Sequence, residues 1–277
     1  MPCSNFFGLD PHLLLRFLFG SAKEGNRFLG SRVNDKRSNV EGLMKQRKTT
    51  ECKLHGHAEF SLFFDDHIID PWIDWLVDYL EQSVETEKYV DGETMQIGWM
   101  VNLIKRDGED LTIYEPDFEA MPVNWIKSVS ATLTHMFLQR YVADSVGLTE
   151  QMDFPRFNQT AICCNKFGKN GIGFLASRFA PSANNPEDSG WFLSCLEPTH
   201  DHNSAEILSL ISLYEAATIN KFIVPYLALP EQICVMETGN PDDFTIGMND
   251  DELPIERESY LQRWLSDRRM RDANFDR

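Results

Sequence analysis

The sequence predicts an α+β protein with two compact domains, in which mostly antiparallel strands pack against helices. Its hydrophobic fraction of 42% and aromatic fraction of 12% suffice for a substantial core in 277 residues. Segments with the two-residue period of strands alternate with segments of helical period. The polar stretch EQMDFPRFN separates two groups of such segments and is typical of a linker. We therefore expect domains at 55–150 and 158–250, after a flexible basic extension at 1–50 and before a charged helix or tail at 251–277.

The first domain is expected to have the order β-α-β-β-α. HAEFSLFF is rich in β-prone residues and predicts a strand. In the helix that follows, Asp70 is expected as the N-cap and Pro71 at the first helical position. Asp107-Gly108 marks the turn of a hairpin in MQIGWMVNLIKRDGEDLTIYEP, and Gly147 ends a long helix in NWIKSVSATLTHMFLQRYVADSVG. The apolar side of the first helix consists of Trp72, Trp75, Leu76, Tyr79 and Leu80.

The second domain is expected to contain three short strands followed by a helix. The strands lie in TAICC, GIGFLASRF and SGWFLSCL, and a Gly/Asn-rich turn joins the first two. The apolar residues of AEILSLISLYEAATI recur at helical spacing. KFIVPYLALPEQICVM is interrupted by two prolines and is expected to be extended. The last segment, YLQRWLSDRRMRDANFDR, predicts a short helix that frays into a charged tail.

The net charge of −17 is unevenly distributed along the chain. Residues 1–54 hold ten Lys/Arg against five Asp/Glu, whereas residues 55–150 hold five against nineteen and residues 151–277 hold eleven against nineteen. Without a basic stripe to neutralise phosphates, we expect no binding to nucleic acid. An acidic surface instead favours a partner with a basic face, although acidity also simply promotes solubility.

The basic N-terminal stretch has few apolar residues to bury. Met44 begins a stretch typical of a natural start, so it is a candidate for the true first residue, and only 11–19 predicts a short helix before it. No apolar run reaches the roughly 18 residues of a membrane span, and Arg16 interrupts the one apolar N-terminal run, which makes a poor signal peptide. The six cysteines form no CxxC pair, so we expect reduced thiols and a cytoplasmic protein without membrane contact.

Two groups of histidines are candidate metal ligands. His55 and His57 on one strand, with Asp65, Asp66 and His67 nearby, offer ligands for a zinc ion. His200-Asp201-His202 offers a second group in a polar loop. Neither group contains a ligand pair at the spacing of a known zinc motif, and surface histidines account for both, so we expect no metal and no cofactor.

The chain offers few candidates for nucleophilic catalysis. Cys163, Cys164 and Cys195 fall within expected strands, where a free cysteine is usually a small buried hydrophobe. Ser189 lacks the strand-turn-helix setting of a GxSxG nucleophile. We therefore expect no enzyme. The alternative is a small metal-dependent hydrolase that uses His55, His57 and His67, or a small hydrolase that uses the histidines of 200–202.

The stretch NPEDSGWFLSCLE admits two interpretations. It is a loop followed by a half-buried strand that begins at Trp191, or it is a surface at which Trp191 anchors a partner. Charge points to the second interpretation, because residues 181–252 hold thirteen Asp/Glu against a single lysine, Lys221. We nevertheless expect DSGW to shape a turn and anchor a core strand, with the acids around it as the better candidates for contact.

The same region resembles the immunity protein 33-like domain. The resemblance covers roughly residues 160–238 and rests on a G..VGF..R stretch, then DSGW.F..G.E, then an aliphatic segment before P.L..P.G. Cys195 or Leu196 stands where the family has a glycine before the acid, and Gln232 stands near the later glycine. The matching positions are Gly171, Gly173, Phe174, Arg178, Asp188, Ser189, Gly190, Trp191, Phe192, Glu197, Pro225, Leu227 and Pro230.

The resemblance implies a bacterial cytoplasmic antidote that binds and blocks a toxin, for example a nuclease, delivered by a secretion system. A regulatory binding module without a toxin is a further alternative. The residues expected to shape the motif are Gly171, Gly173, Ser189, Gly190, Pro225 and Pro230. The candidates for contact with the toxin are Glu187, Asp188, Trp191, Glu197, Asp201, Asp242 and Asp243.

Overall fold

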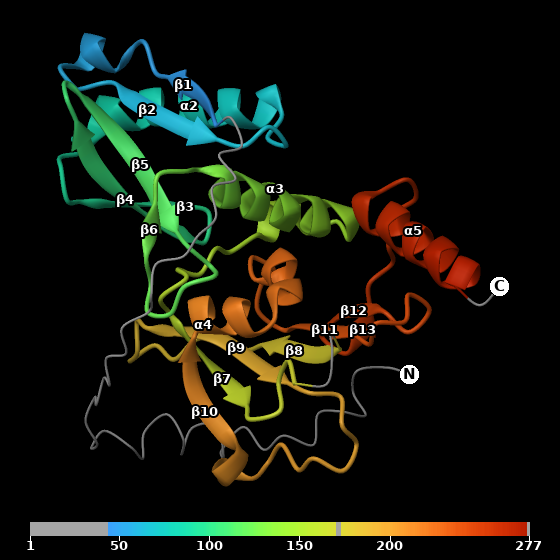
Figure 1. The fold of residues 1–277 in the computed structure, drawn as a ribbon. Coiled ribbons are helices and arrows are strands. Elements are labelled where there is room, and N and C mark those ends of the chain that lie inside the picture. The colour runs from blue at the N-terminus through green and yellow to red at the C-terminus, as the bar shows by residue number, and fades with distance from the viewer. Residues whose placement is uncertain (1–43, 170–172, 276–277) are drawn as a thin grey trace.

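The computed structural model describes residues 44–169 and 173–275 and contains two mixed sheets with helices packed between and beside them (Figure 1). The expected α+β class is confirmed. Two strand pairs, β2 with β5 and β7 with β9, are parallel. The other pairings are antiparallel, as expected.

The first sheet has the strand order β1-β2-β5-β4-β3, with β6 paired to the end of β5. The expected hairpin is present, because Asp107 pairs with Asp110 across a turn in which Gly108 has a φ of 65°. Helix α2 (Asp70–Thr86) covers one face of this sheet (Figure 1). The strands are β1 (Lys45–Lys48), β2 (Phe60–Phe64), β3 (Thr94–Ile97), β4 (Met100–Asp107), β5 (Asp110–Pro116) and β6 (Trp125–Ile126).

The first sheet differs from expectation at its start. Residues 45–48 form β1 and pair with β2, so they belong to the sheet and not to the extension expected at 1–50. The rest of that extension, with the short helix expected at 11–19, lies outside the described residues.

Helix α2 also begins differently from the prediction. Ile69 is its N-cap and no side chain caps it, so Asp70 is the first helical residue. The buried face consists of Ile73, Leu76, Leu80 and Val84, while Trp72, Trp75 and Tyr79 lie half-buried at its margin. The aromatic side chains were expected on the apolar side because they recur at helical spacing, but the smaller aliphatic side chains are the buried ones.

The second sheet has the strand order β10-β7-β9-β8-β11-β12-β13. The three strands expected at its centre are present, but β7 and β8 do not pair directly, because β9 lies between them. The strands are β7 (Thr160–Cys164), β8 (Phe174–Arg178), β9 (Asp188–Ser194), β10 (Leu208–Ser212), β11 (Ile233–Glu237), β12 (Thr245–Met248) and β13 (Asp251–Glu252).

Two expectations for this half of the chain were wrong. The helix expected at 205–219 is strand β10 followed by the short helix α4 (Leu213–Ile219), which begins where the Ser212 hydroxyl accepts the Glu215 N–H at 3.1 Å. The segment expected to be extended begins with a 3-10 helix, η5 (Lys221–Tyr226), that contains Pro225. Pairing with β7 decides the first case, because the apolar residues of this segment fit the period of a strand as well as that of a helix.

Helix α3 (Ser130–Ser145) lies between the two sheets and contributes to both cores (Figure 1). Leu133 and Met136 pack into the core of the first sheet, and Val142 and Ala143 pack into the core of the second. Gly147, with a φ of 70°, follows the end of the helix as expected.

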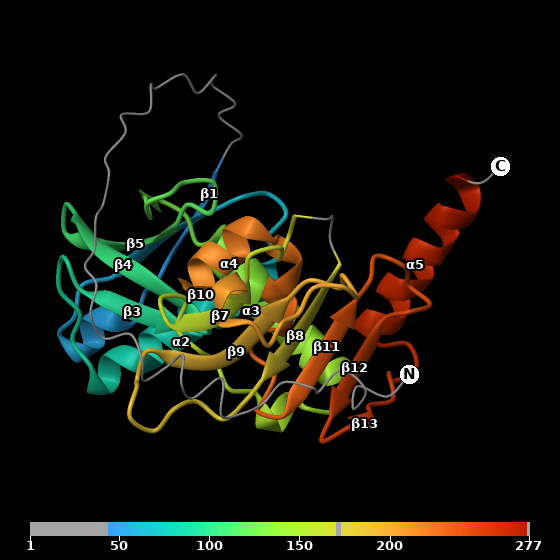
Figure 2. The ribbon, with the colours of Figure 1, turned by 90° about the horizontal axis from the view of Figure 1, so that it is seen from below.

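The segments expected to be a linker and a tail also belong to this packed body. Phe157 is buried in the second core, and its N–H donates to Trp99 O at 2.8 Å. Helix α5 (Tyr260–Phe275) packs on α3 through the buried Leu261 and Leu265, and its far end projects from the body (Figure 2). The two halves therefore share one continuous contact region.

A buried carboxylate holds the start of α3. Glu115, near the end of β5, is 1% exposed. Its oxygens accept the N–H groups of Ala131 and Thr132 at 3.1 and 2.7 Å and the Thr132 hydroxyl at 2.9 Å. Burial raises the pKa of Glu115, and these donors act in the opposite direction by favouring the ionised form. The contact ties the first sheet to the N-terminus of the shared helix, where a negative charge is favourable.

We predict that Glu115→Gln lowers the free energy of unfolding by about 2 kcal/mol, because the amide loses the charge and turns a donor toward the helix N–H groups. Urea denaturation measures the change. Glu109→Gln, in the exposed hairpin turn, is the control and should leave the midpoint unchanged. Equal midpoints for the two variants would contradict the role given to Glu115.

Candidate functional site

The DSGW motif forms the start of β9 and is held by its own polar groups. The Asp188 carboxylate accepts the N–H groups of Ser182 at 2.8 Å and Gly190 at 2.9 Å. The buried Ser189 hydroxyl donates to Thr160 O at 2.7 Å, which fastens β9 to β7. Asp188 and Ser189 therefore fix the turn into the strand.

Gly190 is the position of the motif at which no other residue fits. Its φ is 76°, and a Cβ added there would lie 2.1 Å from the carbonyl oxygen of Phe179. Phe179 N also donates to Gly190 O at 2.9 Å, so the two backbones are in direct contact. A side chain would force β8 and β9 apart.

Trp191 lies in the core and contacts a buried arginine. Its ring is 1% exposed, and Nε1 donates to Leu227 O at 3.2 Å. The Arg178 guanidinium lies 5.9 Å from the ring centroid and is 2% exposed. It donates to the carbonyl oxygens of Ser189 and Leu229 at 3.2 and 2.6 Å and pairs with the Asp153 carboxylate at 2.7 Å. The motif is therefore part of the fold.

The structure corrects two of the candidates for toxin contact. Asp188 and Trp191 are buried and cannot reach a partner protein. Asp201 is exposed and accepts the Asn203 N–H at 3.1 Å. The other candidates also lie away from the core and are engaged within the chain. Those contacts are Glu187 with Arg156 at 3.2 Å, Glu197 with Lys166 at 2.6 Å, Asp242 with Arg269 at 2.6 Å and Asp243 with Asn240 at 2.8 Å.

The remaining motif residues lie in the same region of the second sheet. A Cβ on Gly173 would lie 3.2 Å from Leu196 Cδ1 and 3.3 Å from Glu237 O, so this glycine allows a close approach. Pro225 lies inside η5. Pro230 follows Leu229, whose carbonyl Arg178 binds. Gly171 lies outside the described residues.

His55, His57 and His67 do not form a metal site in the described part of the chain. His57 is buried between main-chain groups, because Nδ1 lies 2.6 Å from Ala58 O and Nε2 accepts the Tyr89 N–H at 3.0 Å. Both of its ring nitrogens are therefore used. His55 and His67 are exposed, and His67 Nε2 lies 3.4 Å from the Thr134 hydroxyl. The alternative of a hydrolase built on these histidines loses its geometric basis.

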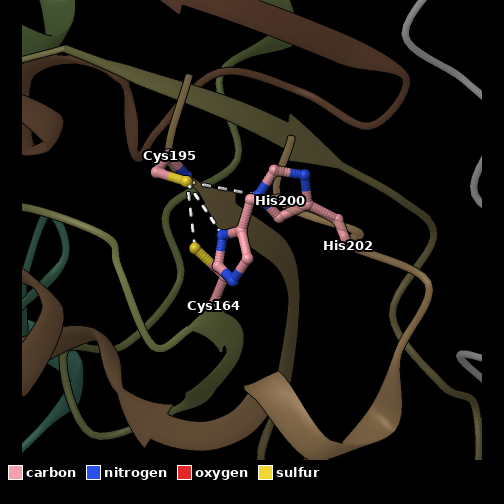
Figure 3. A group of neighbouring side chains, drawn as sticks. All are labelled: Cys164, Cys195, His200 and His202. Atoms are coloured by element: carbon pink, nitrogen blue, oxygen red, sulfur yellow. Dashed lines mark hydrogen bonds between the residues drawn. The ribbon is translucent and has the colours of Figure 1, made fainter. Parts of the chain in front are cut away.

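A different set of side chains converges at the opposite end of β9 from the DSGW motif (Figure 3). Cys164 is the last residue of β7, Cys195 follows β9, and His200 and His202 lie in the loop after it. Cys195 Sγ lies 3.1 Å from His200 Nδ1 and 3.4 Å from His202 Nε2. The four possible ligand atoms all lie within 4.8 Å of one another. We call this set the Cys/His cluster.

The Cys/His cluster is partly buried and partly accessible to solvent. Both cysteines are buried and both histidines are half-buried. Burial raises the pKa of the Cys164 thiol, and burial followed by the neighbouring His200 lowers the pKa of His202, so both groups favour their neutral forms. A cavity of about 380 Å³ adjoins Cys195 and the two histidines. Such a set can bind a soft metal ion, pair a thiol with a base, or form a disulfide.

Sequence reasoning considered the two histidines together and the two cysteines separately from them, and it missed the set of four. Cys164 and Cys195 are 31 residues apart, so no short motif contains them. They meet because β7 and β9 are parallel neighbours, and parallel strands end at the same edge of a sheet. The sequence did contain one signal for the cluster: two cysteines lie at the ends of two expected strands, and His-x-His follows the second of them.

Comparison of the chain with protein-family models, curated proteins and solved structures found no match. Among the described residues, no helix has both the length and the apolar character needed to cross a membrane. The functional argument therefore rests on the residues of this chain.

We predict that Gly190→Ala lowers the free energy of unfolding by about 3 to 5 kcal/mol, because left-handed strain adds to a backbone clash. Gly108→Ala is the matched control: its φ is 65°, but nothing lies within 4 Å of the added Cβ. It should cost only about 1 to 2 kcal/mol from strain. Thermal and urea denaturation of both variants measure the difference, and equal losses would refute the close contact with Phe179.

Proposed function

We propose that the protein is a stoichiometric inhibitor of the immunity-protein kind, which binds a toxin with a basic face in the bacterial cytoplasm and blocks it without chemistry. Two observations support the proposal. The resemblance to the immunity protein 33-like domain falls on residues that build the second sheet. The observation that carries the proposal is a group of exposed acids at the edge of that sheet.

These acids surround the last hairpin of the sheet. Asn249 and Asp250 have φ values of 52° and 70°, as the two central residues of a type I′ turn require, and the turn leads into edge strand β13. Asn249 N donates to Gln232 O at 3.3 Å, which brings the preceding loop alongside. The exposed carboxylates here are Glu231, Asp250, Asp251 and Glu252, and we call them the acidic edge.

The acidic edge is suited to a cationic partner because its carboxylates form no close ion pair within the described chain, although Glu231 is attracted by the nearby Arg178. None of the four carboxylates lies within ion-pair distance of a cationic side chain among residues 44–169 and 173–275. Like charges held close together repel, and a basic surface relieves that repulsion on binding. By contrast, Glu187, Glu197 and Asp242 would first have to release their own partners.

The experiment is co-expression of the full chain with the product of the neighbouring upstream gene, followed by purification of the complex. A one-to-one complex and a loss of toxin activity at one equivalent of inhibitor are expected. Turnover of a substrate by the purified protein, abolished by one point mutation, would overturn the proposal and favour an enzyme.

We predict that Asp251→Asn with Glu252→Gln slows association with the toxin by about threefold to tenfold at about 50 mM salt. The effect should fade toward about 500 mM salt, because screening removes steering over this range. Asp78→Asn with Glu85→Gln, on the exposed side of α2, makes the same change in charge and is the control. Stopped-flow rates decide: a flat salt profile, or equal slowing in both variants, would exclude steering by the acidic edge.

A further inference from the structure

We propose that Cys164, Cys195, His200 and His202 bind one Zn²⁺ ion as a structural site. Two cysteine sulfurs and two imidazole nitrogens are a common ligand set of structural zinc. Such soft and borderline ligands select against Mg²⁺ and Ca²⁺, which take oxygen. This inference goes beyond the inhibitory function and does not depend on it.

The spacing of the ligand atoms fits a tetrahedron around one ion. With Zn–S near 2.3 Å and Zn–N near 2.0 to 2.1 Å, tetrahedral ligands are separated by about 3.3 to 3.8 Å. Cys195 Sγ lies 3.1 Å from His200 Nδ1 and 3.4 Å from His202 Nε2. Because no pair of the four atoms is more than 4.8 Å apart, shifts of about 1 Å complete the coordination.

The neighbouring groups suit a bound thiolate. The main-chain N–H of Cys195 donates to Cys164 Sγ at 3.2 Å, and such outer contacts orient metal-binding sulfurs. The Lys166 ammonium lies in the same region and is held by Glu197 at 2.6 Å. That ion pair engages Glu197, one of the two carboxylates of the cavity wall; the other is Asp201.

Four protein ligands leave no open position on a tetrahedral ion, so the site would be structural and not hydrolytic. The ion would join three segments: the end of β7, the residue after β9, and the loop that carries His200 and His202 (Figure 3). That loop is otherwise held by short-range turns, among them Ser204 N to Asp201 O at 3.1 Å. Metal binding would fix it against the sheet.

Two other uses of the same atoms are chemically reasonable and are distinguished by the test. Cys195 with His200 could act as a thiol and its base, as in nucleophilic catalysis. Cys164 and Cys195 could be oxidised to a disulfide, provided that an oxidant is present. Neither use requires His202, whereas a tetrahedral site requires all four side chains.

The experiment is metal analysis of the full chain, purified after removal of any histidine tag and dialysed against metal-free buffer with reductant. About one zinc ion per chain is expected for the wild type. The Cys164→Ser and His202→Asn variants should each retain at least about tenfold less zinc per chain than the wild type. Cys163→Ser and His67→Asn are the controls, because Cys163 is an equally buried neighbour on β7 and His67 an exposed histidine outside the cluster. Both controls should keep the zinc.

A second measurement does not depend on whether the variants fold. Wild-type protein stripped of metal and loaded with Co²⁺ should show tetrahedral cobalt bands with thiolate charge transfer. Protein that takes up no stoichiometric Zn²⁺ or Co²⁺, or that shows an octahedral cobalt spectrum, would overturn the proposal. So would a Cys164–Cys195 disulfide in the intact mass of the freshly purified protein, or iodoacetamide labelling of Cys195 that depends on His200 but not on His202.

Discussion

Helix α3 has to bury apolar residues on both sheets at once, and the arrangement of the molecule depends on this constraint. Its first half contributes Leu133 and Met136 to one core and its second half contributes Val142 and Ala143 to the other. Between these groups, the buried Gln139 side chain donates from Nε2 to Val224 O at 2.9 Å. Because its two ends are buried in different cores and Gln139 binds the main chain of the second half, the helix fixes how the two halves of the chain meet.

This shared helix explains why the expected division into two separate domains describes the sheets but not the packing. The sheets occupy separate stretches of sequence, 45–126 and 160–252, as the composition suggested. The stretch between them, however, carries α3 and the buried Phe157, and the Asp153 carboxylate in it pairs with Arg178 at 2.7 Å. Its polar residues and its proline are typical of a linker, which is why it was expected to be one. Its burial arises from partners far away in the sequence, which local composition does not report.

Turn and helix-end residues in the sequence correctly predicted the features that depend only on neighbouring residues. The hairpin at Asp107-Gly108 and the helix end at Gly147 follow from backbone conformations that glycine favours. The error at 205–219 arises because its apolar residues satisfy both periods, and pairing with β7 decides between them. The Cys/His cluster could not be predicted from the sequence for a related reason. Cys164 and Cys195 meet because β7 and β9 are parallel neighbours, and local sequence does not show which strands are neighbours. The DSGW motif was identified from the sequence. Whether Trp191 faces the core or a partner, however, depends on which side of β9 is covered.

Strand β9 carries the DSGW motif at its start and leads into a member of the Cys/His cluster at its end, so its anchoring in the sheet positions both. At the start, Asp188, Ser189 and Gly190 fix the strand to β7 and β8. At the end, Cys195 leaves the sheet at a position that this anchoring determines, so its sulfur is held in place before any ion arrives. Asp251 and Glu252 of the acidic edge lie four strand positions away in the order β9-β8-β11-β12-β13, about 19 Å at the usual strand spacing. At that separation, screening by salt leaves little direct electrostatic coupling, so zinc would act on stability and the acidic edge on association, and each can be changed without the other.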